Sequence, residues 1–326
     1  MTARPITLDV RLDTAAIRAA LERDARAGLL STPKSLPAVW FYDDVGSELF
    51  DEITRLPEYY PTRAERALLE AHAKDVAEAT RAVALVELGA GTCTKTRILL
   101  DALTATGTLR RYVAVDVAET TLVAATEQLA EEYPELEVTA TIADFHRLAG
   151  LFEGEGPILV AFLGGTIGNL EPRERARFLV QLDAELDHFA SFLLGTDLVK
   201  SRDRLLAAYD DASGVTAEFN RNVLTVLNRE LGADFDPGCF EHVVRFDEDH
   251  QWIEMRLRAS SAQKVHVPGL GIELTFDEGE ELRTEISAKF TPEAVREELD
   301  RGGFVVDHQF GAEGGEFLLT LSHPYC

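Results

Sequence analysis

The sequence predicts an α/β fold built on a doubly wound parallel sheet, with a smaller α+β domain inserted into it. Between residues 83 and 197, short apolar runs typical of strands alternate with helical patterns, which indicates a parallel sheet with helices on both faces. The first of these strands leads directly into a glycine-bearing turn and then a helix. Residues 198–289 have a different sequence pattern, with helical stretches followed by short strands of alternating apolar residues. We interpret them as the insertion.

The parallel sheet accounts for the middle of the chain. Ahead of it, residues 14–29 carry apolar side chains at helical spacing, prolines break the chain at 33–37, and residues 62–79 are expected to form a helix capped by Thr62. We expect strands at 83–88, 111–116, 136–142, 157–163 and 189–197, with the clearest helices at 118–132 and 172–187.

The end of the chain completes the same domain. Thr291 followed by Pro292 is typical of a helix start, and a final antiparallel pair of strands is expected after it. These last strands are placed at 304–310 and 316–322, while the insertion should hold helices at 201–211 and 214–232 and strands at 251–259, 262–267, 272–276 and 281–289. The domains are therefore predicted as 64–198 with 290–326 for the sheet, and 10–63 with 199–289 for the second domain.

The turn after the first strand indicates what kind of ligand the sheet binds. Gly89 and Gly91 follow the strand as Gly-x-Gly, without the third glycine that most dinucleotide sites use for close helix–strand packing. Glu87 lies two residues before the first glycine, and an acidic residue there fits a positively charged ligand such as S-adenosylmethionine. By itself, the pattern is also compatible with a simple tight turn.

Polar side chains follow the next three strands in the same way. Asp116 ends the second strand, where it can accept hydrogen bonds from both ribose hydroxyls of an adenosine, or instead cap the following helix. Asp144 and Phe145 follow the third strand, where an adenine would lie, and a polar turn is the alternative. Asn169 ends a glycine-rich loop after the fourth strand and is either a ligand-binding amide or a helix cap. Together these positions favour an S-adenosylmethionine site.

Charge and composition exclude several classes of partner. The chain has 326 residues, 46% of them hydrophobic and 27% charged, which is ordinary for a globular protein. Its 32 basic and 57 acidic residues give a net charge of −25, which repels nucleic acid and anionic membrane surfaces but also simply favours solubility.

The cysteines and histidines show no metal or disulfide pattern. Cys93, Cys239 and Cys326 lie far apart, and His242 and His250 lack ligand spacing, so we expect no metal and a reducing cytosol. We expect no signal peptide, because the start lacks an apolar core, and no membrane span, because no run of about 18 apolar residues occurs. The expected location is therefore the cytoplasm.

Six long motifs make the sequence resemble a known family. They are Pro33-Lys34-Ser35-Leu36-Pro37, Trp40-Phe41-Tyr42-Asp43, Leu56-Pro57-Glu58-Tyr59-Tyr60-Pro61-Thr62-Arg63, Phe162-Leu163-Gly164-Gly165-Thr166-Ile167-Gly168-Asn169, Leu194-Gly195-Thr196-Asp197-Leu198-Val199-Lys200 and Phe219-Asn220-Arg221-Asn222-Val223-Leu224. From about residue 15 to the end, the chain resembles the histidine-specific, S-adenosylmethionine-dependent methyltransferases of ergothioneine biosynthesis. The resemblance implies a class I (Rossmann-like) methyltransferase domain interrupted by a substrate-binding domain. It also implies three methyl transfers to the α-amino group of L-histidine, giving hercynine.

The resemblance further implies which residues form the site. For the cofactor, S-adenosylmethionine, they are Gly89, Lys95, Asp116, Asp144 and Phe145; for the substrate they are Tyr59, Asn169, Tyr209, Glu285 and Ser287. L-histidine and its mono- and dimethyl forms are then the substrates, bound by a monomer. The chain departs from the expected family pattern at Cys93-Thr94, Gly165 and Ala288.

The chemistry of these residues is consistent with the implied roles. Lys95, near a helix start, can pair with the methionyl carboxylate of the cofactor, and Glu285 and Ser287 on one strand face can hold the two imidazole nitrogens. The amine must lose protons, and we assign this to solvent with Tyr42 or Tyr59 as relay; both rings can also stabilise the growing ammonium. Alternatives are a methyltransferase for another free amino acid such as tryptophan, a silent cofactor-binding subunit and, least favoured, an RNA methyltransferase.

Overall fold

The computed structural model describes residues 5–144, 148–311 and 315–325 and divides into two compact units. Unit 1 comprises Met1–Leu12, Pro61–Val199 and Lys289–Cys326, and unit 2 comprises Asp13–Tyr60 and Lys200–Ala288. Each unit has its own sheet and its own buried core, so each is described separately.

Unit 1 is built on a mixed sheet of eight strands within the described residues, in the order β1-β5-β4-β3-β6-β7-β14-β13. The first six strands in that order run parallel, and β14 and β13 form the antiparallel ending. The chain moves outward from β3 in both directions, so β3 and β6 flank the point where the strand order reverses. The strands are β1 (Thr7–Val10), β3 (Ala84–Leu88), β4 (Arg111–Asp116), β5 (Glu137–Ile142), β6 (Ile158–Phe162), β7 (Ala190–Asp197), β13 (Phe304–Phe310) and β14 (Phe317–Pro324).

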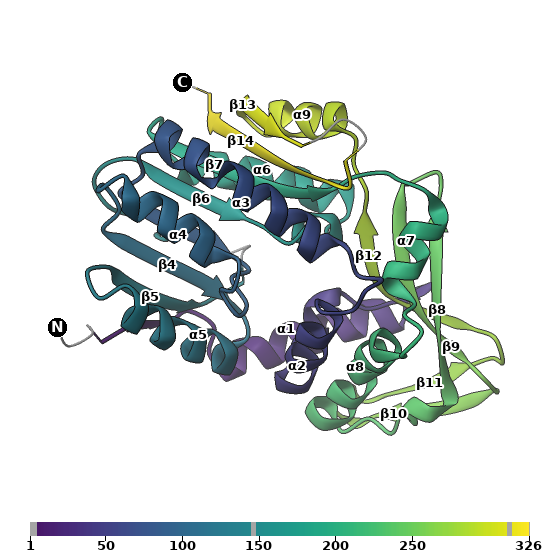
Figure 1. Cartoon of the computed structure of the whole chain (residues 1–326). Helices are drawn as coiled ribbons and strands as arrows, with labels where there is room; N and C mark the ends of the chain where they lie inside the picture. The colour runs from purple at the N-terminus through teal and green to yellow at the C-terminus, as the bar shows by residue number, and fades with distance from the viewer. Residues whose placement is uncertain (1–4, 145–147, 312–314, 326) are drawn as a thin grey trace. The chain divides into compact units, whose positions relative to one another are not determined.

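Helices cover both faces of this sheet, as Figure 1 shows. Leu69 and Val76 of α3, Leu100 of α4 and Leu129 of α5 pack in one buried cluster with Tyr112 on β4. On the other face, α6 packs against β6: the ring centroids of Phe178 on α6 and Phe162 on β6 lie 5.0 Å apart. The helices are α3 (Pro61–Thr80), α4 (Thr96–Ala105), α5 (Glu119–Glu132), the 3-10 turn η2 (Thr166–Asn169), α6 (Pro172–Glu185) and α9 (Pro292–Arg301). Because both faces are covered, every residue of β3 and β6 is buried, and all of them except Glu87 are apolar.

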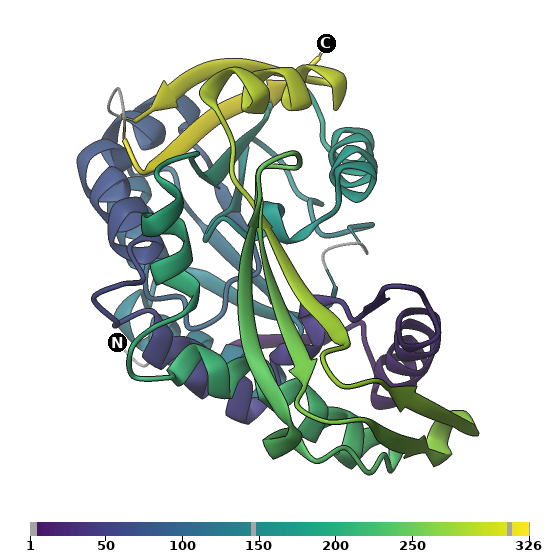
Figure 2. The same cartoon turned by 90° about the vertical axis from the view of Figure 1, so that its right-hand side faces the viewer.

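Unit 2 combines a four-stranded sheet, in the order β2-β12-β9-β8, with a separate hairpin of β10 and β11. Figure 2 shows β8, β9 and β12 as long strands lying side by side. Helix α8 packs on β8 and β9 and also against α2. The elements are α1 (Thr14–Leu29), β2 (Lys34–Ser35), η1 (Ala38–Phe41), α2 (Asp44–Ile53), α7 (Arg202–Tyr209), α8 (Val215–Leu231), η3 (Pro237–Cys239), β8 (Phe240–Asp247), β9 (Trp252–Ala259), β10 (Gln263–Val267), η4 (Pro268–Leu270), β11 (Ile272–Phe276) and β12 (Glu281–Ala288).

The structure differs from the sequence-based expectations in a few elements. Thr62 is not a cap, because α3 already begins at Pro61. Strands β1, β2 and β8 were not expected. β1 is a mostly exposed edge strand, β2 has only two residues, and β8 is only partly buried, so none has a strong apolar pattern.

Asp43 joins helices α2 and α8 of unit 2. Its Oδ1 accepts hydrogen bonds from the Gly46 amide at the start of α2 (2.8 Å) and from Asn222 Nδ2 (2.7 Å). Its Oδ2 accepts from Arg229 Nη1 at 2.7 Å. This single carboxylate therefore caps α2 and holds it against α8.

Replacing Asp43 by alanine is expected to lower the free energy of unfolding by about 2–3 kcal/mol, because a helix cap and two interhelical bonds are lost together. Asp43→Asn keeps one acceptor oxygen and should lose about half as much. Urea unfolding measures both, with Asp44→Ala, at an exposed neighbouring position, as control. An Asp43→Ala variant as stable as the control would contradict this assignment.

Candidate functional site

Five of the predicted site residues lie at the carboxyl ends of adjacent parallel strands of unit 1. Gly89 follows β3, Asp116 is the last residue of β4, and Asp144 lies two residues after β5. Lys95 immediately precedes α4, and Asn169 ends η2 after β6. Since β5, β4, β3 and β6 are neighbours in the sheet, these ends share one edge, where α/β folds bind their ligands. The predicted Phe145 lies outside the described residues.

The turn after β3 is tied to the end of β4. Gly89, at φ +69°, donates its amide to the Val115 carbonyl at 2.9 Å. Asp116 accepts from the Gly91 amide (2.8 Å) and, through its other oxygen, from the Ala118 amide (3.0 Å). A carboxylate has about four lone-pair positions, so Asp116 retains acceptor capacity for the hydroxyls of a ribose. The residues present therefore fit the adenosine portion of S-adenosylmethionine.

Glu87 has a different environment from the one expected of a ligand-binding carboxylate. It is only 3% exposed, and its Oε2 accepts from Thr96 Oγ1 (2.5 Å) and Tyr112 Oη (2.8 Å). The Tyr112 hydroxyl also lies 3.4 Å from Cys93 Sγ. Because β3 is central in the sheet, this side chain points into the core, where burial raises the pKa of Glu87 to about 7 and that of Cys93 to about 12. Glu87 thus stabilises the turn from within.

The raised pKa of Glu87 predicts a pH-dependent stability. The folded protein binds a proton that the unfolded chain releases above its ordinary pKa of 4.5, so stability falls as the pH rises from about 4.5 through about 7. The whole window corresponds to about 3 kcal/mol. A Glu87→Gln variant should lose this slope, so the difference in unfolding free energy between variant and wild type should change by that amount between pH 4.5 and 7.5. If the unfolding free energies of variant and wild type, measured in urea, change in parallel across this pH window, Glu87 does not titrate as described.

Lys95 is paired with a residue that the sequence patterns did not single out. Its ammonium forms an ion pair with Glu65 on α3, and the other oxygen of Glu65 accepts the Gly164 amide at 2.7 Å. Glu65 shares the buried side of α3 with Leu69 and Ala73. A charged residue at the helical spacing of an apolar face was the signal that could have revealed it.

The predicted substrate residues of unit 2 are linked by an aromatic cluster. The ring centroids of Tyr42 and Phe50 lie 5.6 Å apart, those of Phe50 and Tyr59 6.2 Å, and those of Tyr59 and Tyr209 6.2 Å, all edge-on. Phe219 of α8 completes the cluster, at 5.7 Å from Tyr42. Such a group of rings presents negative faces that can stabilise an ammonium.

Tyr209 joins this cluster to β12. Its hydroxyl lies 2.7 Å from Ser287 Oγ, in hydrogen-bonding contact. Glu285 and Ser287 are two residues apart, beyond the irregularity in β12 that lies between Arg283 and Glu285. Their side chains therefore share a face of the strand, as expected. Tyr42, Tyr59, Tyr209, Glu285 and Ser287 all belong to unit 2, whereas Asn169 belongs to unit 1.

His242 is hydrogen-bonded to the backbone of Tyr209. Its Nε2 lies 2.9 Å from the Tyr209 carbonyl and its Nδ1 lies 2.8 Å from Asn220 Nδ2. Asn220 in turn accepts from the Thr284 hydroxyl at 2.6 Å. This pattern fits a neutral ring with its proton on Nε2, in agreement with the lowered pKa that burial gives His242. Both ring nitrogens of His242 are therefore engaged in hydrogen bonds within unit 2.

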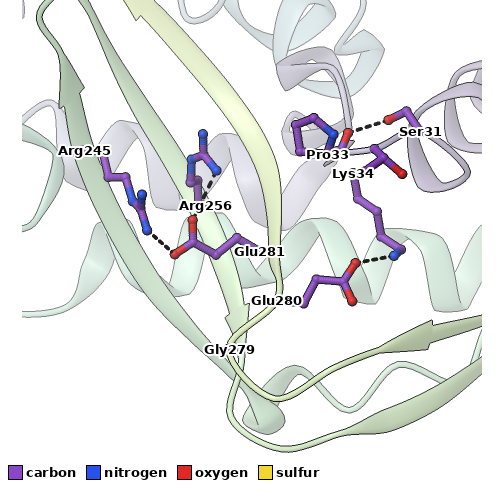
Figure 3. Close-up of a pocket in the computed structure, with 9 residues that line it drawn as sticks. Ser31, Pro33, Lys34, Arg245, Arg256, Gly279, Glu280 and Glu281 are labelled. Carbon is purple, nitrogen blue, oxygen red and sulfur yellow. Dashed lines mark hydrogen bonds and ion pairs between the residues drawn. The ribbon is translucent and has the colours of Figure 1, made fainter.

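Unit 2 also contains a polar cavity of about 420 Å³, shown in Figure 3. Its charged groups are paired with one another: Lys34 with Glu280, and both Arg245 (2.5 Å) and Arg256 (3.1 Å) with Glu281. None of the predicted site residues lines it. These ion pairs connect β8 and β9 to β12, and β2 to the residue that precedes β12, so we assign them to the stabilisation of the sheet.

Among the described residues, no group of three or more His, Cys, Asp or Glu side chains is placed to hold a metal ion. In the same part of the chain, every helix is too short or too polar to span a bilayer.

Unit 1 is a Rossmann-like α/β protein of the nucleotide-binding class. This class is defined by its strand order and by the polar residues at the carboxyl ends of β5, β4, β3 and β6. Comparison with known proteins defines the family. The family described as "Histidine-specific methyltransferase, SAM-dependent" matches residues 21–324, and the chain belongs to it. The resemblance, the α/β methyltransferase fold class and the dependence on S-adenosylmethionine that were expected from the sequence are confirmed.

The relatives agree with this family. The chain is 52% identical over 303 residues to the histidine N-alpha-methyltransferase of Mycolicibacterium smegmatis, covering 93% of this chain and 94% of the relative. The Mycobacterium tuberculosis protein of the same name matches with the same identity and coverage. An L-tryptophan methyltransferase of Psilocybe serbica is 28% identical to the chain over 323 residues. The match covers 90% of this chain and 89% of the relative.

Proposed function

We propose that this protein transfers three methyl groups from S-adenosylmethionine to the α-amino group of L-histidine, forming hercynine as the first step of ergothioneine biosynthesis. The observation that carries the proposal is the 52% identity, over nearly the full length of both chains, to relatives named histidine N-alpha-methyltransferase. In this proposal the substrate is a free amino acid, and the enzyme acts as a monomer in the cytoplasm.

Within this proposal, unit 1 holds the cofactor. The exposed backbone of the turn at Gly89 receives it, Asp116 accepts the ribose hydroxyls, and Asp144 lies where β5 ends, beside the adenine. Lys95 faces the methionyl carboxylate, helped by the start of α4.

Unit 2 holds most of the substrate. Glu285 and Ser287 grip the imidazole nitrogens, and Tyr209, fixed by Ser287 and His242, holds the carboxylate. Tyr59 orients the α-amino group. A site that hydrogen-bonds both imidazole nitrogens discriminates strongly against amino acids that lack them.

The bound cofactor supplies a methyl group on a sulfonium, which is transferred in line to the amine lone pair. Since positive charge moves from sulfur to nitrogen, the chain contributes mainly by orienting the amine and excluding unproductive poses. The rings of Tyr42, Phe50 and Tyr59 face the growing ammonium, a contact worth about 0.5–2 kcal/mol. Each round releases a proton from nitrogen to solvent, with Tyr42 or Tyr59 as relay. The trimethylated product has no N–H left to donate and leaves.

Mass spectrometry of histidine incubated with enzyme and S-adenosylmethionine tests the proposal. The expected product gains three methyl groups, all on the α-nitrogen. Parallel incubations with tryptophan and other free amino acids should give no product. Methylation of tryptophan in preference to histidine, or no methylation of any amino acid, would overturn the proposal.

A further inference from the structure

Glu65 is a carboxylate with no exposed surface, in the second turn of α3. Burying a carboxylate is costly unless it is paired and hydrogen-bonded. Both oxygens of Glu65 have such partners: one forms the ion pair with Lys95, and the other accepts the Gly164 amide at 2.7 Å. Its partners come from the start of α4 and from the loop after β6, the two segments that carry the predicted cofactor and amine contacts.

The sheet leaves space for this carboxylate. At Gly195 on β7, a Cβ atom would overlap Glu65 Oε1. Any other residue at position 195 would therefore displace the carboxylate from between Lys95 and Gly164. This close approach makes Glu65 a fixed element of the carboxyl edge of the sheet.

Lys95 keeps binding capacity while it is held by Glu65. Its side chain is 21% exposed, and within the described residues Glu65 is the partner of its ammonium. An ammonium has three donors, so two are available for an anionic ligand. A Cβ at Gly164 would lie 3.7 Å from Lys95 Nζ, which places the ammonium beside the loop that leads to Asn169.

We propose that Glu65 is a positioning residue that holds Lys95 toward the methionyl carboxylate of the cofactor and, through Gly164, fixes the loop that leads to Asn169. The inference rests on the proposed function for the role of Lys95. It goes beyond that function, because a buried residue outside the binding surface then determines the affinity for the amino-acid portion of the cofactor. The adenosine portion, held at Asp116, does not depend on it.

Two ligands separate this role from a merely structural one. S-adenosylhomocysteine carries the amino-acid portion with its carboxylate, and 5′-methylthioadenosine lacks it. In Glu65→Gln, the side-chain carbonyl still accepts the Gly164 amide, but the amide NH₂ no longer attracts Lys95. By calorimetric titration of the full-length protein, the affinity for S-adenosylhomocysteine should fall about tenfold or more, while that for 5′-methylthioadenosine changes less than about twofold.

A matched control removes a different ion pair from the same unit. Glu298 pairs with Arg175 through two hydrogen bonds of 2.9 Å between α9 and α6. Glu298→Gln should leave the affinities for both ligands unchanged. An equal loss for both ligands in Glu65→Gln, or no loss for either, would overturn the proposal.

If Glu65→Gln does not fold, Gly195→Ala provides the same test. The added Cβ displaces the carboxylate of Glu65, although Glu65 and Lys95 themselves are both unchanged. The same selective loss of S-adenosylhomocysteine is expected, and an equal loss for both ligands contradicts the inference. These titrations need no histidine. A wild-type protein that does not methylate histidine would refute the proposed function and leave this result standing on its own.

Discussion

Asp116→Ala is expected to reduce kcat/KM for S-adenosylmethionine by about a hundredfold or more. The change removes the acceptor of the Gly91 and Ala118 amides together with the proposed ribose contact. Two partly buried amides would lose their partner, and each unsatisfied group costs up to about 1–3 kcal/mol. Steady-state kinetics with varied cofactor measure the effect, and titration with S-adenosylhomocysteine should show a matching loss of affinity.

Two further variants make this test specific. Asp116→Asn keeps one acceptor oxygen and should be intermediate. Asp101→Ala removes an exposed carboxylate of the same unit, which accepts only the Tyr133 hydroxyl at 2.7 Å among the hydrogen bonds described, and should behave as wild type. Unchanged cofactor affinity in Asp116→Ala would show that the carboxyl edge at β4 does not hold the ribose.

Glu285→Ala is expected to lower kcat/KM for histidine by about 5- to 150-fold, because an imidazole N–H would be left unpaired at a cost of about 1–3 kcal/mol. The affinity for S-adenosylhomocysteine should not change, since the cofactor residues belong to unit 1. Rates of methyl transfer at varied histidine concentrations check this prediction.

Glu273→Gln is the control for Glu285. It changes a carboxylate of the same unit, on β11, whose partners are Lys264 and His266 at the surface. Its kinetics with histidine should match those of the wild type. Full activity of Glu285→Ala on histidine would remove Glu285 from the substrate site.

Much of unit 1 could be predicted because its strands carry strong local signals. The buried apolar runs of β3 and β6 and the turn between Gly89 and Gly91 specify their structure within a few residues. Asp116 and Asn169 could be placed at one edge because parallel strands end together. β1 escaped prediction, because a short exposed edge strand buries too little to leave a periodic apolar pattern.

The contacts that support the site could not be predicted in the same way. The partners of Glu65 are 30 and 99 residues away in the chain, so its role follows only from tertiary packing. Similarly, His242 reaches the Tyr209 carbonyl across 33 residues. Glu87 was expected to face a ligand, but the central position of β3 directs it into the core, where hydroxyl groups bind it.

A crystal structure with S-adenosylhomocysteine and L-histidine bound together tests the central claim most directly. Asp116 is expected to accept hydrogen bonds from the ribose hydroxyls. The imidazole nitrogens are expected to contact Glu285 and Ser287, with the α-amino group directed to the cofactor sulfur. Glu285 and Ser287 pointing away from the bound histidine, or an adenosine bound elsewhere than at the ends of β3 and β4, would contradict it.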